Sequence, residues 1–149
     1  MGDSRRHEVF GRFVFRQFPR AKSALVVADG KGELAAYLAK RYRVRVVEAK
    51  PRQAVLRKRV NYTRGWFSQY DDVPEDIIVG MHPDEATSEI VRAAVRLHKR
   101  WAVVPCCLKG IDAHGVHGFQ AWVKKLMAIG WPCRQTRLKI SGKNVVIWG

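Results

Sequence analysis

The chain has 149 residues, 47% of them hydrophobic, which is enough for one ordinary core and too little for two, so we expect one domain over residues 1–149. Its formal charge of +15, from 28 Lys and Arg against 13 Asp and Glu, favours a polyanionic partner, with RNA, DNA and an anionic membrane surface all open. No apolar run approaches the roughly 20 residues that cross a bilayer, and the charged N-terminus lacks a signal-peptide core, so we expect a cytoplasmic protein.

Residues 1–20 contain a predicted basic amphipathic helix, which belongs to the same domain. Apolar side chains recur there at helical spacing, at Val9, Phe10, Phe13 and Val14. Among the basic side chains between them, the candidates for contact with substrate phosphates are Arg5, Arg12 and Arg16. Two interpretations stay open: a helix that only packs on the edge of a sheet, or one that also binds substrate.

Residues 24–48 have the pattern of a strand, a glycine turn, a helix and a second strand. The run 24–28 is short and apolar, as in a strand buried on both faces, and it ends at a turn that contains Gly30 and Gly32. A helical period follows, and then a second strand that ends at Glu48. An acid at this place accepts hydrogen bonds from ribose hydroxyls, which predicts a nucleoside-containing cofactor. The third glycine that a pyrophosphate requires is missing, which favours a cofactor without one; a unit that binds nothing is the alternative.

Residues 51–59 are predicted to form a helix opened by Pro51, in a strongly basic part of the chain. Between Lys40 and Arg64 there are ten Lys or Arg and one acid, Glu48. The segment therefore adds further candidates for phosphate contacts, which are Arg52, Arg57 and Arg59.

A third strand is predicted over residues 60–67, followed by a polar, acidic loop over residues 68–75. Trp66 and Phe67 lie at the end of this strand. Either aromatic ring belongs to the core or offers a stacking surface to a base.

Residues 76–80 form another short apolar run, predicted to lie beside the first strand in the middle of the sheet. The turn over residues 81–87 should face the glycine turn, because ligands of open α/β sheets bind outside the carboxyl ends of the strands. His82 in this turn either takes a proton as a general base or only bonds the backbone. Asp84 is the second candidate catalytic residue, and it also suits the N-cap of a helix that runs to Arg100.

Residues 101–107 are the next predicted strand, and Cys106 near its end is a candidate for the substrate pocket, with a small apolar filler as the alternative. Three Cys are too few for a disulfide framework, and no second pair completes a zinc site, so we expect reduced thiols and no metal. The glycine-containing loop 109–118 is expected to be flexible and able to close over substrate. Its two histidines, His114 and His117, suggest a metal site only weakly.

The C-terminal part is predicted to contain an amphipathic helix over residues 119–127 and a hairpin of residues 135–140 and 145–148. Together with the earlier elements, this predicts an α/β fold: a mostly parallel sheet with helices on both faces and a C-terminal antiparallel hairpin. Such a hairpin is not a feature of the sheet of ordinary Rossmann dehydrogenases.

Four segments carry a resemblance to class I S-adenosylmethionine-dependent methyltransferases. VVADGKGEL (26–34) is similar to their first motif and VVEAKP (46–51) to their second. RRHEVFGRF (5–13) resembles their lead-in segment, which marks Arg5 and His7 as cleft residues. GMHPDEAT (80–87) stands where amino-methylating members carry an Asn-Pro-Pro-Tyr-like motif, of which only the proline is shared. The resemblance implies a Rossmann-like methyltransferase fold.

The same resemblance implies S-adenosylmethionine as the cofactor. The residues that it marks for cofactor binding are Ala28, Asp29, Gly30, Gly32, Glu48, Phe67, Gly80 and Met81. The chain departs from the relatives at two positions, with Val26 where their strand carries an Asp and Asp29 where they have Gly. Asp29 either takes over the role of the missing acid or crowds the site.

From the sequence we predict a methyltransferase that acts on nucleic acid, with RNA (tRNA or rRNA) favoured over DNA. We expect a monomer or weak homodimer without a membrane or metal partner. No Lys or Arg lies between Gly65 and Val91, where there are seven acids, so the surface should be polarised. Three alternatives stay open: an inactive relative that only binds RNA, a small-molecule methyltransferase, and a nucleotide-dependent oxidoreductase, which the hairpin disfavours.

Overall fold

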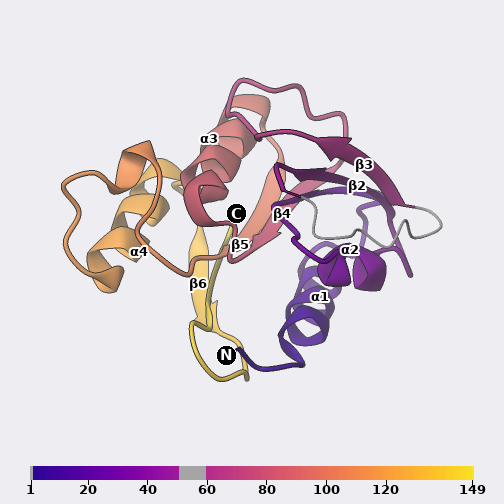
Figure 1. Ribbon diagram of the computed structural model, residues 1–149, viewed down its shortest axis with the longest axis horizontal. Helices are drawn as coiled ribbons and strands as arrows, with labels where there is room; N and C mark the ends of the chain where they lie inside the picture. The colour runs from indigo at the N-terminus through magenta and orange to yellow at the C-terminus, as the bar shows by residue number, and fades with distance from the viewer. Residues whose placement is uncertain (1, 51–59) are drawn as a thin grey trace.

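The computed structural model describes residues 2–50 and 60–149. Within them, seven strands form one sheet in the order β3-β2-β1-β4-β5-β7-β6 (Figure 1). The predicted helix 51–59, with Arg52, Arg57 and Arg59, lies outside the described residues. The bounds of the strands are Ser23–Val27 for β1, Arg43–Glu48 for β2, Val60–Arg64 for β3, Ile77–Met81 for β4, Arg100–Val104 for β5, Arg134–Arg137 for β6 and Val145–Trp148 for β7.

The first five strands are parallel, and the last two form the antiparallel hairpin. β1 is central, because it pairs with β2 on one side and with β4 on the other. β7 pairs antiparallel with β5 and so joins the hairpin to the parallel part. The fold class predicted from the sequence is confirmed.

Helices cover both faces of the sheet, as Figure 1 shows: α1 (Arg6–Gln17) and α2 (Glu33–Leu38) lie on one side, and α3 (Thr87–Leu97) and α4 (Phe119–Ile129) on the other. Two short 3-10 helices, η1 (Asp84–Ala86) and η2 (Ile111–Ala113), follow β4 and β5.

Strand side chains alternate between two apolar cores, as a period of two requires. Val26, Val46 and Val79 belong to the core under α1 and α2. Their neighbours Leu25 and Ile78 belong to the core under α3 and α4. Burial on both faces explains why these strands are near-continuous apolar runs in the sequence.

The N-terminal helix is α1, and it buries one face. Phe10, Phe13 and Val14 are in the core, whereas Arg12 and Arg16 are exposed. The predicted amphipathic helix is therefore confirmed, and its packing on the sheet is common to both interpretations of this segment.

Several predicted boundaries differ from the structure, among them that of the third strand, which ends at Arg64 instead of residue 67. Two of the differences have identifiable reasons. β5 ends at Val104, because Pro105 has no backbone N–H to continue the ladder. α3 ends at Leu97 rather than Arg100, with His98 in the left-handed conformation at its C-cap. Among residues 2–50 and 60–149, every helix is too short or too polar to pass through a membrane.

The loop 109–118, predicted to be flexible and able to close over substrate, is joined to α3 by an ion pair. Arg92 of α3 donates through Nε and Nη2 to both carboxylate oxygens of Asp112, at 2.9 and 2.7 Å. Asp112 is 9% exposed. A bidentate pair of this kind is among the stronger side-chain contacts, so it anchors η2.

Candidate cofactor and substrate cleft

A cavity of about 570 Å³ lies at the carboxyl ends of the parallel strands. Its volume is within the range of roughly 300–1,000 Å³ that small-molecule sites occupy. It is lined by four segments at or just after the ends of β1, β2, β3 and β4, namely 27–31, 47–50, 65–67 and 81–86. Arg6, His7, Glu33 and Lys109 complete the wall. The glycine turn and the turn over residues 81–87 therefore meet at one cleft, as the sequence predicted.

The turn after β1 is held by the carboxylate of Glu48. Its Oε2 accepts a hydrogen bond from the N–H of Gly30 at 2.8 Å, and its Oε1 accepts one from the N–H of Lys50 at 3.0 Å. Each carboxylate oxygen has two lone pairs, so each keeps acceptor capacity for a further donor. A Cβ at Gly30 would meet nothing within 4 Å, and its φ of +61° favours glycine. The backbone at Gly30 thus leaves room for a ligand beside the acceptors of Glu48.

Asp29 has a different role, because its side chain caps α2. Oδ1 accepts from the N–H of Leu34 at 3.2 Å and Oδ2 from the N–H of Ala35 at 2.9 Å. These are free donors of the first helical turn, where a carboxylate is favoured. Burial is the largest influence and raises the pKa of Asp29 to about 7, although the two backbone hydrogen bonds act in the opposite direction. Asp29 lines the cavity, but its oxygens are committed to the helix.

An aromatic wall follows β3. Phe67 is buried at 7% exposure and belongs to the core, whereas Trp66 is 68% exposed, and both line the cavity. From the sequence, either ring was a candidate for the surface on which a base stacks. Trp66 is the ring that is still available to a ligand face.

His82 is held in one tautomer by the C-terminal hairpin. Its Nε2 lies 3.1 Å from the carbonyl oxygen of Lys143. A carbonyl only accepts, so Nε2 carries the proton and Nδ1 keeps its lone pair. Burial is the main cause that lowers the pKa of His82, so the ring is neutral near pH 7. A neutral imidazole with a free Nδ1 is equipped to take a proton.

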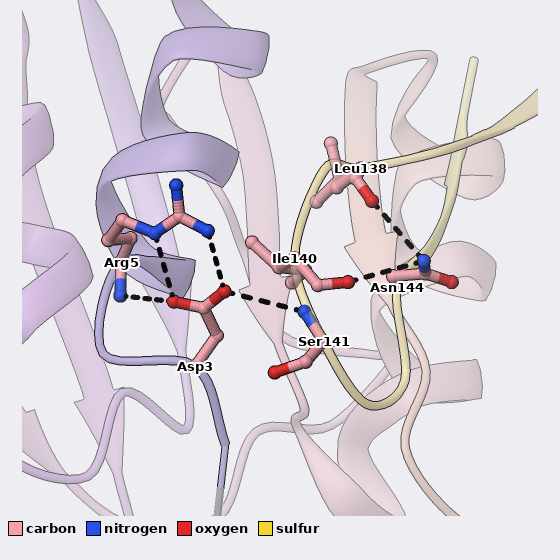
Figure 2. Close-up of polar contacts among 6 residues, drawn as sticks. All are labelled: Asp3, Arg5, Leu138, Ile140, Ser141 and Asn144. Carbon is pink, nitrogen blue, oxygen red and sulfur yellow. Dashed lines mark hydrogen bonds and ion pairs between the residues drawn. The ribbon is translucent and has the colours of Figure 1, made fainter.

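The loop that supplies the Lys143 carbonyl is itself internally bonded (Figure 2). The side-chain amide of Asn144 donates to the carbonyls of Leu138 and Ile140 at 3.3 and 3.4 Å. Figure 2 also shows Asp3, which accepts from the backbone N–H of Ser141 at 3.4 Å. The N-terminal segment and the hairpin loop are therefore hydrogen-bonded to each other.

Residues with strained, left-handed backbone conformations cluster at the cleft. Within the described residues, positive φ outside glycine occurs at Ala28, His82, Asp84 and His98. The first three of these line the cavity. Sparsely populated backbone conformations persist where the surrounding structure enforces them, and they cluster at functional sites.

Asp84 does not cap α3, which corrects the N-cap prediction. The cap position is Ala86, without a side-chain hydrogen bond, and Thr87 Oγ1 donates to the carbonyl of Asp84 at 2.8 Å. The Asp84 carboxylate instead accepts from the thiols of Cys106 and Cys107 at 3.2 and 3.1 Å. Cys106 does not line the cavity; it contacts the cleft through Asp84.

The N-terminus of α1 contributes Arg6 and His7 to the cleft, rather than Arg5. Arg5 is bound to Asp3, with Nη2 3.0 Å from Oδ2, and its side chain is 66% exposed. Arg12 pairs with Glu8 one helical turn away. A shift of one residue on a helix turns a side chain by about 100°, so sequence alone did not separate Arg5 from Arg6.

The structure brings most of the predicted residues together and leaves some aside. The predicted residues that line the cavity are His7, Ala28, Asp29, Gly30, Glu48, Phe67, Met81, His82 and Asp84. Those described but not in its wall are Arg5, Arg12, Arg16, Gly32, Gly80 and Cys106. Gly32 and Gly80 serve packing, because a Cβ would come within 2.8 Å of Tyr62 Oη and 2.7 Å of Ile90 Cδ1, respectively.

Sequence reasoning missed several cleft residues, above all Arg6 and Lys109. Lys109 had a usable signal, because it follows β5 and the loops after parallel strands meet at one edge. Together with Lys31 and Lys50, these cations face the acids of the cavity, which are Asp29, Glu33, Glu48, Asp84 and Glu85. The cleft therefore has mixed charge, although the whole chain is strongly basic.

Solved structures of similar fold are methyltransferases. S-adenosylmethionine-bound CalS10, an amino pentose methyltransferase from Micromonospora echinaspora, matches with a TM-score of 0.68 and 14% identity over 96% of this chain and 89% of that chain. The sugar N-methyltransferase KedS8 from Streptoalloteichus matches with a TM-score of 0.62 and 16% identity, covering 98% of this chain and 86% of its own. The mitomycin 7-O-methyltransferase MmcR matches with a TM-score of 0.62 and 15% identity over 95% of this chain and 52% of its own.

These likenesses confirm the class I methyltransferase fold that the motifs predicted. No family model matches the chain, and no curated protein sequence matches it.

The pKa of Asp29 predicts a pH dependence of stability. Its folded pKa of about 7 lies above the ordinary 3.8, so the folded state holds a proton that the unfolded state loses between those values. The free energy of unfolding should therefore fall as pH rises through this window. Each pKa unit corresponds to about 1.36 kcal/mol, so the loss is on the order of 4 kcal/mol.

Asp29→Asn is the matched control, since it keeps the shape and cannot ionise. Denaturant unfolding of both proteins across this pH window should show the parent losing stability relative to the variant as pH rises. A stability difference that stays constant with pH would contradict the assignment.

Proposed function

We propose that the chain is a methyltransferase that uses S-adenosylmethionine. One observation carries this proposal: at the end of β2, Glu48 presents spare acceptor capacity beside the open backbone of Gly30. Ribose hydroxyls are the donors that suit a carboxylate in this position. Trp66 and Phe67 follow the neighbouring strand and offer a face for an adenine.

The residues present fit this cofactor in three respects. Glu48 would hold the ribose, the glycine turn would admit the chain that bears the sulfonium, and the aromatic wall would contact the base. Bound S-adenosylmethionine supplies an electrophilic methyl group. The protein contributes position, because a transfer between two bound partners depends on alignment of the reacting atoms.

His82 is the residue that we assign to the acceptor. Its Nδ1 carries a lone pair, and its backbone is fixed by the N–H of His82 donating to the carbonyl of Val104 at 2.9 Å. A hydroxyl or an ammonium group must lose a proton to become a nucleophile, and Nδ1 is the base that the geometry offers. Arg6 and Lys109 would orient a polar or anionic acceptor at the same end of the cavity.

A small polar molecule with a hydroxyl or amino group is the acceptor that the cleft supports best. The cavity wall mixes acids and bases, which suits a polar ligand better than a polyphosphate chain. The structural neighbours CalS10 and MmcR are an amino pentose methyltransferase and a mitomycin 7-O-methyltransferase. RNA is the second candidate, and the charge of +15 is the observation that favours it.

Cofactor affinity should depend on Glu48. Loss of a charged acceptor for two hydroxyls costs about 1.5–3 kcal/mol, so we expect Glu48→Ala to weaken S-adenosylmethionine binding by roughly 10- to 150-fold. Isothermal titration calorimetry measures this directly. Glu8→Ala, which removes an exposed carboxylate from α1, should leave the affinity unchanged. Equal affinity of the Glu48→Ala variant and the parent would place the cofactor elsewhere.

Turnover should depend on His82. With labelled S-adenosylmethionine and a panel of amino sugars, hydroxylated aromatics and RNA, the active acceptor can be identified and kcat measured. His82→Ala should lower kcat by roughly 10²–10⁴-fold without loss of cofactor affinity. The acidic limb of the parent's pH profile should lie below the ordinary histidine value, because burial lowers the pKa of His82. Unchanged turnover would limit His82 to a structural role.

RNA binding, if it occurs on the face of α1, should depend steeply on salt. Each phosphate neutralised on a single strand contributes about −0.7 to the slope of log K against log salt. Arg16→Gln on α1 should flatten the slope by about this amount, whereas Lys124→Gln on α4, across the sheet, should not. Binding that is absent at low salt, or insensitive to salt, would leave the small-molecule acceptor as the remaining candidate.

A further inference from the structure

Two thiols and a carboxylate converge where the loops after β4 and β5 meet. The Sγ atoms of Cys106 and Cys107 lie 3.2 Å apart. They lie 3.2 and 3.1 Å from the same oxygen, Oδ1 of Asp84. Within residues 2–50 and 60–149, these three side chains are the one group of three or more metal-ligating residues whose atoms all lie within 4.8 Å of one another. They form a nearly equilateral triangle of donor atoms.

The two loops that carry these donors are fixed to each other. Gly110 has a φ of +94°, and a Cβ there would lie 2.8 Å from the carbonyl oxygen of Glu85. Only glycine permits this approach, which brings the segment after β5 onto η1. Asp84 is held from the other side by Thr87, whose Oγ1 donates to its carbonyl. The donor triangle is therefore set by the backbone before any ion binds.

The donor set selects one class of ion. Thiolates favour borderline-soft cations, whereas calcium and magnesium take oxygen ligands. The charge also balances. Lys109 Nζ lies 3.9 Å from Oδ2 of Asp84, so a neutral dithiol, a carboxylate and an ammonium sum to zero. One divalent cation that displaces two thiol protons leaves that sum unchanged.

We propose that Asp84, Cys106 and Cys107 form a binding site for Zn²⁺. On binding, the two S–H bonds break, both protons pass to solvent, and each sulfur forms a bond to the ion through the electron pair that it keeps. Zinc–sulfur distances of about 2.3 Å at tetrahedral angles put two sulfurs roughly 3.8 Å apart. The thiols therefore separate by about half an ångström, a movement that side-chain rotation supplies.

The site stands beside the cleft and does not depend on the proposed methyl transfer. Asp84 and Lys109 line the cavity, so the ion would lie at its wall. Three protein ligands leave a fourth position open, which distinguishes reactive zinc sites from closed structural ones.

Zinc binding to the reduced chain of residues 1–149 under anaerobic conditions tests the proposal. Calorimetric titration with zinc chloride in buffers of different ionisation enthalpy gives both stoichiometry and proton release. We expect one zinc ion per chain with two protons released. Affinity should fall at least 100-fold in Cys106→Ser, in Cys107→Ser and, to a smaller extent, in Asp84→Asn. Cys133→Ser is the matched control, because Cys133 lies after α4 and donates to the carbonyl of Met127 instead.

Cadmium provides the second measurement, because its thiolate complexes have an ultraviolet charge-transfer band that surface histidines do not produce. The band should appear in the parent and in Cys133→Ser with the intensity of two thiolates, and this holds even if a cleft variant fails to fold. Absence of the band in the parent, or zinc binding that persists when Cys106 and Cys107 are both replaced, would overturn the proposal. Loss of binding in Cys133→Ser would do the same.

Discussion

The reversal of strand order at β1 is the constraint on which the rest of the structure depends. From β1 the chain proceeds outward through β2 and β3 with α2 on one face, and later through β4 and β5 with α3 on the other. The connections after β1 and β4 therefore leave the sheet on opposite faces, and side chains cannot close the space between them. The topology of the sheet therefore fixes the position of the cavity, whereas the side chains of the lining turns determine its chemistry.

The carboxylates at this edge of the sheet differ in burial and in hydrogen-bond partners, and they therefore have different roles. Glu48 accepts a hydrogen bond from the turn at Gly30 and can still accept hydrogen bonds from a ligand, whereas both carboxylate oxygens of Asp29 accept from backbone N–H groups of α2. Asp84 binds two thiols and an ammonium group. Asp29 thus serves as a helix cap in the turn after β1. The cap keeps α2 in place, while Glu48 keeps acceptor capacity for a ligand.

Periodicity and turn chemistry were sufficient for the fold. The apolar runs at β1 and β4, buried on both faces, predicted a parallel sheet, and the glycines after β1 favoured a ligand site at its edge. Residues predicted from strand ends, such as Glu48, Phe67 and His82, line the cleft because strand ends are fixed by topology. Cleft residues on a helix were harder to predict, since neighbours such as Arg5 and Arg6 differ only in the direction in which they project from α1.

Contacts between loops that are distant in the sequence could not be predicted from it. Cys106 and Cys107 lacked a partner along the chain, and the carboxylate that joins them comes from a loop more than 20 residues earlier. The same holds for His82, whose tautomer is fixed by the carbonyl of Lys143 in the C-terminal hairpin. Local patterns carry no information about such pairings, because they are set by how the sheet edge brings the loops together.

The central claim is that the glycine turn and the end of β2 form one nucleoside site. Backbone amide NMR of the chain, titrated with S-adenosylhomocysteine, tests it most directly. We expect the largest shifts at Gly30, at Glu48 and Ala49, and at Phe67, with none in the hairpin strand β6. Shifts confined to other surfaces, or no shift at saturating ligand, would contradict it.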